Sequence, residues 1–156
     1  MRATLLAILS LSLAVSLSPA GAATKIDDPV KFVTQVYAMT VGKKPEPDDI
    51  YTDRLKALWD LDSKEAHGEV GRWDTDFWMN GQDGTVSDVH VSKVDVENAT
   101  GRMVVVAKFK NEKTPNEIHF YFEKTAAGWK LDDARSLLGE QWTLSLILKY
   151  GWDGKN

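Results

Sequence analysis

The sequence has no cysteine, and histidine is scarce, with three residues. Without cysteine no disulfide can stabilise the fold, and no thiol can act as nucleophile or metal ligand. The histidines, His67, His90 and His119, lie far apart, and none belongs to a His-Glu-x-x-His pair. The Gly-x-Ser-x-Gly nucleophile turn and the glycine-rich phosphate loop are also absent from the sequence. We therefore predict no catalytic nucleophile, no metal and no cofactor.

Long hydrophobic runs are few. One apolar stretch, Leu5–Leu17, follows Arg2 and precedes the small residues of Ser18–Ala23. It is shorter than the roughly 20 residues that a membrane span needs, and its layout is that of a secretory signal with a peptidase site. We predict that residues 1–23 are a cleaved signal peptide. The mature protein is then periplasmic or secreted, with no membrane anchor after cleavage.

Neither sign of charge is in large excess. The chain has 19 basic and 23 acidic residues, a net charge of −4 at pH 7, and removal of residues 1–23 removes only Arg2 among them. A slightly acidic domain has no general affinity for nucleic acid or anionic lipid. The expected partner is therefore a small molecule or a protein, bound by a monomer or a dimer. The remaining chain, 24–156, is long enough for one core, so we predict a single domain.

The first half of this domain has helical periodicity. Asp28-Pro29 is typical of a helix start, and the spacing of the apolar residues that follow predicts a helix that ends at Gly42. Thr52 is the predicted cap of a second helix, which ends by His67-Gly68. The next segment, 68–87, is irregular, and we expect its Phe77-Trp78-Met79 run to plug into the core.

From Asp88 the period changes to two, which predicts strands. The valine alternation changes phase within the first of these strands and predicts a β-bulge near Ser92-Lys93. Further strands are predicted over 102–110, 117–123 and 129–135, and Thr143 and Gly151 bound a last helix. Helices followed by a strand meander predict an α+β fold. We expect N-terminal helices packed on a curved, mostly antiparallel sheet of about four to six strands, with a short C-terminal helix.

Tryptophan is abundant, with six residues. By spacing, Trp59, Trp129 and Trp142 are predicted to lie in the core. Trp73 and Trp78 belong to the irregular segment and are the better candidates for exposure.

Three segments carry a resemblance to a known superfamily. They are Tyr51–Leu55 after the opening helix, Asn80–Asp83, and Gly128–Asp133 together with Trp142–Leu144. The chain resembles the cone-shaped fold of the nuclear transport factor two and ketosteroid isomerase superfamily, also called cystatin-like. Within it, the chain is most similar to a family of exported bacterial proteins of unknown function. The resemblance implies a curved sheet that wraps around N-terminal helices and leaves a pocket at its open end.

Several polar residues are candidates for a pocket or a polar knot. Related folds use an Asp or His with a Tyr donor to move protons beside a carbonyl. The candidates here are Tyr37, Asn80, Gln82, Asp83, His119, Tyr121 and Asp132.

Each candidate also has a structural interpretation. His119 and Tyr121 alternate with apolar residues and fit a solvated sheet face. Asp132 and Asp133 fit a turn cap or a pair with Arg135. Asn80, Gln82 and Asp83 fit a buried knot that satisfies loop backbone groups.

The sequence favours a non-enzymatic binding or protein-interaction domain. Two alternatives stay open. One is an enzyme of isomerase or lyase type with a pocket acid or base. The other is an immunity-type partner that blocks a secreted toxin. The small size, the acidity and the predicted export of this chain favour that alternative.

Overall fold

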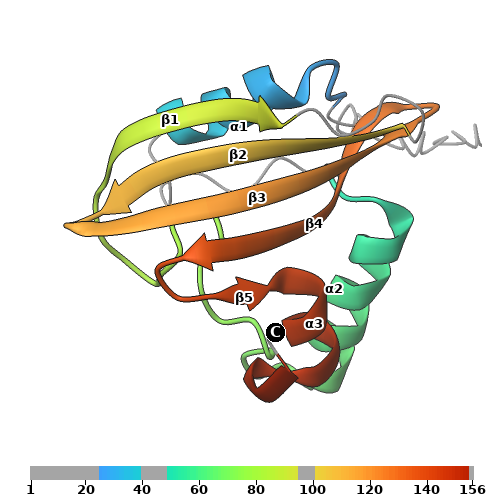
Figure 1. Cartoon of the computed structure of the whole chain (residues 1–156). Helices are drawn as coiled ribbons and strands as arrows, with labels where there is room; N and C mark the ends of the chain where they lie inside the picture. Colours follow the sequence, from blue (N-terminus) through green and yellow to red (C-terminus); the bar gives the residue numbers. More distant parts are fainter. Residues whose placement is uncertain (1–24, 40–48, 95–100, 155–156) are drawn as a thin grey trace, which may run out of the picture.

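The computed structural model describes residues 25–39, 49–94 and 101–154 (Figure 1). The predicted signal peptide, Gly42 and the end of the first predicted strand lie outside these residues.

The structure is α+β, as predicted, with one open antiparallel sheet of five strands in chain order. The strands are β1 (Val86–Val94), β2 (Arg102–Asn111), β3 (Thr114–Thr125), β4 (Gly128–Leu138) and β5 (Trp142–Thr143). Each strand pairs with the next one along the chain, so β1 and β5 form the two edges.

The alternation of β3 explains how the sheet is built. Ile118, Phe120 and Phe122 are almost completely buried, while His119 and Tyr121 between them are partly exposed. Successive side chains of a strand point to opposite faces, so one face of β3 enters the core and the other meets solvent. This confirms the predicted division of the strand into two faces.

Helix α1 (Pro29–Ala38) begins at the predicted cap. The Asp28 carboxylate accepts hydrogen bonds from the amides of Val30 at 2.9 Å and Lys31 at 3.2 Å. The helix ends at Ala38, before the predicted stop, because Met39 has the extended backbone angle ψ of 105°. Its buried side chains face β1 and β2.

Helices α2 (Asp53–Glu65) and α3 (Leu144–Tyr150) lie against each other, and a short 3-10 helix, η2 (Trp152–Gly154), follows. Thr52 caps α2 as predicted, because its hydroxyl oxygen accepts from the Leu55 amide at 3.2 Å. Thr143 and Gly151 bound α3 as predicted, at its N-cap and C-cap positions, but the Thr143 side chain makes no capping hydrogen bond. None of the helices in the described ranges is both long and apolar enough to cross a membrane.

The predicted bulge in the first strand is misplaced. The register of β1 against β2 shifts between Ser87 and His90, ahead of Ser92-Lys93. Asp88 has a φ of 52° there, which breaks the extended backbone and accommodates the extra residue. A further shift lies in β4 at Asp132, where Tyr121 pairs with Asp133 and Phe122 with Leu131.

The irregular segment fills the space on the helix side of the sheet. Trp78 stacks on Phe120 with ring centroids 4.6 Å apart, and the Tyr37 hydroxyl donates to the Trp78 carbonyl at 2.7 Å. Phe77, Trp78 and Met79 are buried, which confirms that this run plugs into the core. Trp73 and Trp78 are 7% and 3% exposed, so the choice of these two as candidates for exposure is wrong. The segment lacks periodicity because it crosses the core as a loop, yet its aromatic side chains point inward.

The other tryptophans follow the prediction in part. Trp142 is fully buried, whereas Trp59 and Trp129 are only partly buried against the core.

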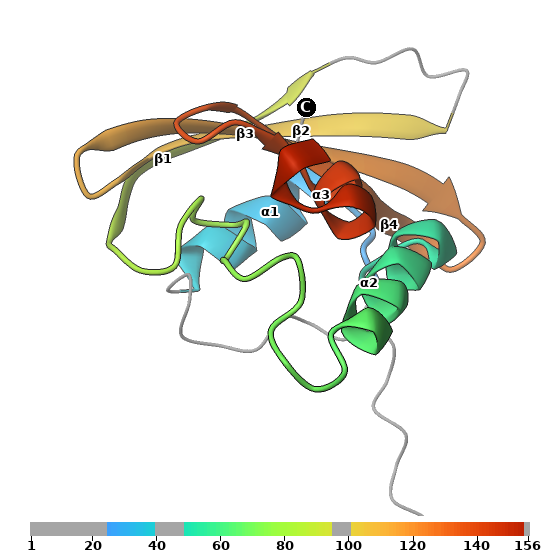
Figure 2. The ribbon, with the colours of Figure 1, turned by 90° about the horizontal axis from the view of Figure 1, so that it is seen from below.

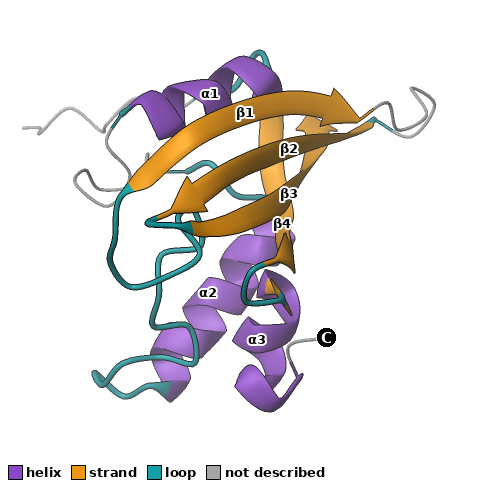
Figure 3. Ribbon diagram, turned by 60° about the vertical axis from the view of Figure 1, so that its left-hand side comes forward, coloured by secondary structure: helices purple, strands orange, loops and turns teal. Residues whose placement is uncertain are grey.

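All three helices lie on the same side of the sheet (Figures 2 and 3). No described helix covers the opposite side, which faces the reader in Figure 1. We call this uncovered side the open face.

Candidate functional site

The strand register decides which side chains are neighbours on the open face. His119 of β3 lies opposite Arg135 of β4, and Arg135 lies opposite Thr143 of β5. Tyr121, two residues after His119, lies opposite Val104 of β2. Residues directly opposite each other in an antiparallel pair share a face, so these side chains form two adjacent rows.

A depression of about 530 Å³ lies over these rows. Its lining includes Val104, Tyr121, Arg135 and Thr143, together with charged side chains at the start of β2 and in β4. Ligand pockets of proteins span roughly 300–1,000 Å³, so this depression has the size of a binding site.

Three side chains of the depression are hydrogen-bond donors without a partner. Within the described part of the chain, the side chains of Tyr121, Arg135 and Thr143 form no hydrogen bond or ion pair. A guanidinium and two hydroxyl groups are therefore available to a ligand that brings acceptors.

The acidic groups of the depression, in contrast, are occupied. Asp133 lies on the β4 bulge and caps α3 in place of Thr143. Its carboxylate accepts from the Ser145 amide at 3.0 Å, from the Ser145 hydroxyl at 2.5 Å and from the Ala134 amide at 2.9 Å. Burial raises the pKa of Asp133 above its ordinary value, against the effect of these hydrogen bonds.

Asp132, the other residue of the bulge, pairs with Arg54 of α2 and not with Arg135. Its carboxylate accepts from Arg54 Nε at 3.0 Å and Nη2 at 2.9 Å, and from the Thr52 hydroxyl at 2.7 Å. Burial acts to raise the pKa of Asp132, but the hydrogen bonds from Arg54 and Thr52 outweigh it, so that the pKa is lowered. Arg54 Nη2 also lies 3.7 Å from Asp133 Oδ2, so the two neighbouring aspartates share this guanidinium, while Ser145 contacts Asp133 alone.

A second depression, of about 720 Å³, adjoins the first. Both depressions are lined by Arg102, Glu123 and Asp132, and the second continues to Asp53 and Lys130. Only Asp132 among these residues was a candidate from the sequence. Arg102, Arg135 and Thr143 were missed because isolated surface residues on separate strands carry no motif.

Of the predicted polar knot, only Asn80 is central. Its Nδ2 donates to Asn116 Oδ1 at 2.7 Å and Ser136 Oγ at 3.1 Å, and its Oδ1 accepts from Trp142 Nε1 at 2.6 Å. The network joins the irregular segment to β3, β4 and β5.

Gln82 and Asp83 are exposed, which corrects the prediction that their side chains are buried with Asn80. The backbone carbonyl of Asp83 is held instead by Asn111 Nδ2, at 3.1 Å. The turn after Asn80 runs along the surface, so only backbone groups of Asp83 need an internal partner. Asn111 was missed because it lies at the end of a strand, outside the motif.

The remaining candidates do not form a common pocket. Tyr37 is buried on the helix side of the sheet, and burial together with the charge of Asp76 raises its pKa. His119 lies on the open face, with Nε2 at 2.7 Å from Glu117, which also pairs with Lys108 at 3.0 Å. The hydrogen bonds from His119 and Lys108 lower the pKa of Glu117. Tyr37 and His119 therefore lie on opposite sides of the sheet.

No group of three or more metal-ligating side chains is found in the ranges that the structure describes. Comparison of the chain with protein-family models, curated proteins and solved structures returns no match.

Proposed function

We propose that this chain is a non-enzymatic binding or protein-interaction domain that is exported to the periplasm and adopts the cone-shaped fold. Its ligand binds on the open face of the sheet. One observation carries this proposal: the donors of Tyr121, Arg135 and Thr143 surround one depression, and among the described residues they have no partner.

The occupied carboxylates favour binding over acid–base catalysis. A general acid or base must reach the proton that it transfers. Both oxygens of Asp133 accept hydrogen bonds from Ser145, and Asp132 is neutralised by Arg54. The groups left free in the depression are donors, which suit recognition of an acceptor.

The packing on the helix side of the sheet also favours ligand binding on the open face. In the cone-shaped superfamily a pocket opens between helices and sheet, but here Trp78, Phe120 and Tyr37 pack together in that region. A ligand therefore meets this sheet from the outside.

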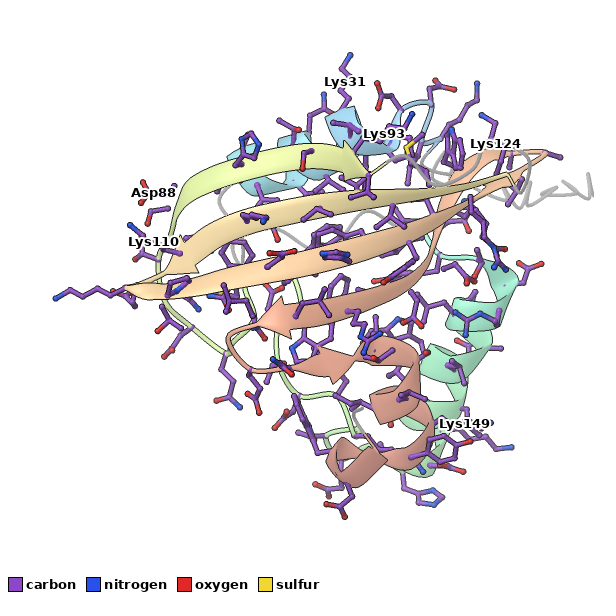
Figure 4. The ribbon with its side chains drawn as sticks, viewed as in Figure 1. Lys31, Asp88, Lys93, Lys110, Lys124 and Lys149 are labelled. Carbon is purple, nitrogen blue, oxygen red and sulfur yellow. The ribbon has the colours of Figure 1, made fainter. Side chains whose placement is uncertain are left out.

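Binding on the open face can be tested by NMR with a library of small molecules and peptides. We expect the ligands found to perturb the amide signals of β3 and β4 around Tyr121 and Arg135. Arg135→Gln should lower the affinity of these ligands. Lys31→Gln on α1 is the matched control, because Lys31 also loses a positive charge and projects from another part of the surface (Figure 4). Ligands that perturb only other surfaces, or that bind Arg135→Gln unchanged, would contradict the proposal.

A further inference from the structure

The two depressions adjoin each other, and we call them together the groove. They share the side chains of Arg102, Glu123 and Asp132, while Thr143 lines only the first and Asp53 only the second. Its lining includes Thr143 before α3, Arg102 at the start of β2 and Asp53 at the start of α2. Its two parts, about 530 and 720 Å³, together offer room for an elongated ligand.

Most charges along the groove cancel in pairs. Arg54 pairs with Asp132 at 2.9 Å, Arg102 with Glu123 at 2.8 Å, and Lys130 with Asp49 at 3.2 Å. Asp133 accepts hydrogen bonds from Ser145 and lies 3.7 Å from Arg54, so Asp132 and Asp133 share one cation. These pairs supply hydrogen-bonding groups along the middle of the groove but little net charge.

One charged side chain without a partner remains in each depression, and the two have opposite sign. Arg135 lines only the first depression and Asp53 only the second. Neither side chain has a hydrogen bond or an ion pair among the residues that the structure describes. The free cation, Arg135, thus lies in the depression next to Thr143 and α3, and the free anion, Asp53, is the first residue of α2.

Resting on the proposed function, we infer that the groove binds a short extended peptide by its two termini. The C-terminal carboxylate binds the guanidinium of Arg135, with the hydroxyls of Tyr121 and Thr143 as further donors. The α-amino group binds the Asp53 carboxylate. A guanidinium pairs with a carboxylate through two parallel hydrogen bonds, which gives affinity and direction together.

The charge pattern selects this occupant over others. A reversed peptide places like charges together at both ends, which opposes binding. Glu123 and Asp133 also line the first depression, and their carboxylates repel a phosphate dianion more strongly than the single negative charge of a peptide C-terminus. A single amino acid is too short to use both depressions.

Four forms of one peptide test this inference: free, amidated at the C-terminus, acetylated at the N-terminus, and blocked at both ends. A graded length series of alanine–valine peptides supplies the probe, and titration calorimetry with the full chain supplies the affinity. We expect amidation to weaken binding to the wild type by roughly 10–100-fold, because a charge-assisted pair is lost. Acetylation should weaken it as well, by a smaller factor, because the amino group meets one exposed carboxylate, whereas the C-terminal carboxylate meets a guanidinium and two hydroxyls.

Two variants assign each effect to its residue. With Arg135→Gln, the free and amidated peptides should bind alike, while acetylation keeps its effect. With Asp53→Asn, the free and acetylated peptides should bind alike, while amidation keeps its effect. Thermal melting confirms that both variants are folded, and Lys31→Gln should reproduce the wild type with all four peptides.

Different results would overturn the peptide assignment and the proposed binding function. Equal binding of all four peptides, tighter binding of inorganic phosphate, or absence of peptide binding overturns the peptide assignment. If other ligands still perturb Tyr121 and Arg135, the binding function on the open face stands. If no ligand perturbs that face, both proposals are wrong.

Discussion

The carboxylate of Asp133 holds the first turn of α3 through Ser145, accepting from its amide at 3.0 Å and from its hydroxyl at 2.5 Å. A helix leaves its first amides without internal partners, and an aspartate that accepts from them supplies the missing acceptor. Here the aspartate comes from a neighbouring strand instead of the residue before the helix.

Loss of this cap should destabilise the protein. We expect Asp133→Ala to lower the free energy of unfolding by about 1–3 kcal/mol, since the Ser145 and Ala134 amides lose their acceptor. Ser145→Ala is the control: it removes the hydroxyl bond but keeps the amide bond, so its effect should be smaller. Urea unfolding followed by circular dichroism measures both. Equal stability of Asp133→Ala and the wild type would contradict the assigned cap.

Asp132 should make stability depend on pH. Its pKa is lowered below the ordinary 3.8, so the folded chain binds this proton more weakly than the unfolded chain. Asp132 therefore stabilises the fold above the unfolded pKa and loses this contribution as pH falls through 3.8 and below. We expect Asp132→Asn to cost about 1–2 kcal/mol near neutral pH, and the difference from wild type to shrink in acid.

Asp133 offers a control of opposite sign for that experiment. Burial raises its pKa, so the folded chain binds this proton more strongly than the unfolded chain. The wild type should then lose stability relative to Asp133→Asn as pH rises from 3.8 through the raised pKa. Urea titrations at stepped pH separate the two residues, and parallel curves for both variants would contradict the assignments.

The Asn80 network should matter far more than its neighbour Asp83. We expect Asn80→Ala to lower the free energy of unfolding by about 2–3 kcal/mol, because the buried Trp142 indole and Asn116 amide lose their partner. Asp83→Asn, on an exposed side chain, should change stability by less than about 0.5 kcal/mol. Thermal melting distinguishes the two, and a larger loss for Asp83→Asn would reverse this interpretation.

Two tryptophans on neighbouring segments should respond differently to removal. Trp142 is 1% exposed, so Trp142→Ala should cost about 3–5 kcal/mol and leave much of the protein unfolded. Trp129 is only partly buried and carries Lys124 over its ring at 5.1 Å, so Trp129→Ala should cost less. Chemical unfolding of both variants tests the order, which a costlier Trp129→Ala would contradict.

The elements with local signals could be predicted from the sequence. Asp28-Pro29 and Thr52 mark helix starts because a cap bonds amides two or three residues away. The alternation around Phe120 marks both faces of β3 because burial repeats with the pleat. These signals depend on neighbours in the chain, so no structure is needed to interpret them.

The rest depends on contacts that no local pattern contains. The cap of α3 comes from Asp133, twelve residues before the amide that it accepts from. Trp78 belongs to an unpatterned loop and is buried because that loop crosses Phe120. Arg135 became a site residue only when the register placed it beside Thr143 and near Tyr121. Long-range pairing, and not composition, decides each of these.

The agreement between strand order and chain order has a kinetic consequence. From β2 to β5 each strand finds its partner across a short connection, so the entropy lost on closing each of these loops is small. Tyr37, in contrast, reaches the Trp78 carbonyl across 41 residues. Sequence-local pairing favours early formation, so we expect β2, β3 and β4 to assemble first and α1 to dock afterwards. The surface that bears Tyr121 and Arg135 then belongs to the part of the chain that folds earliest.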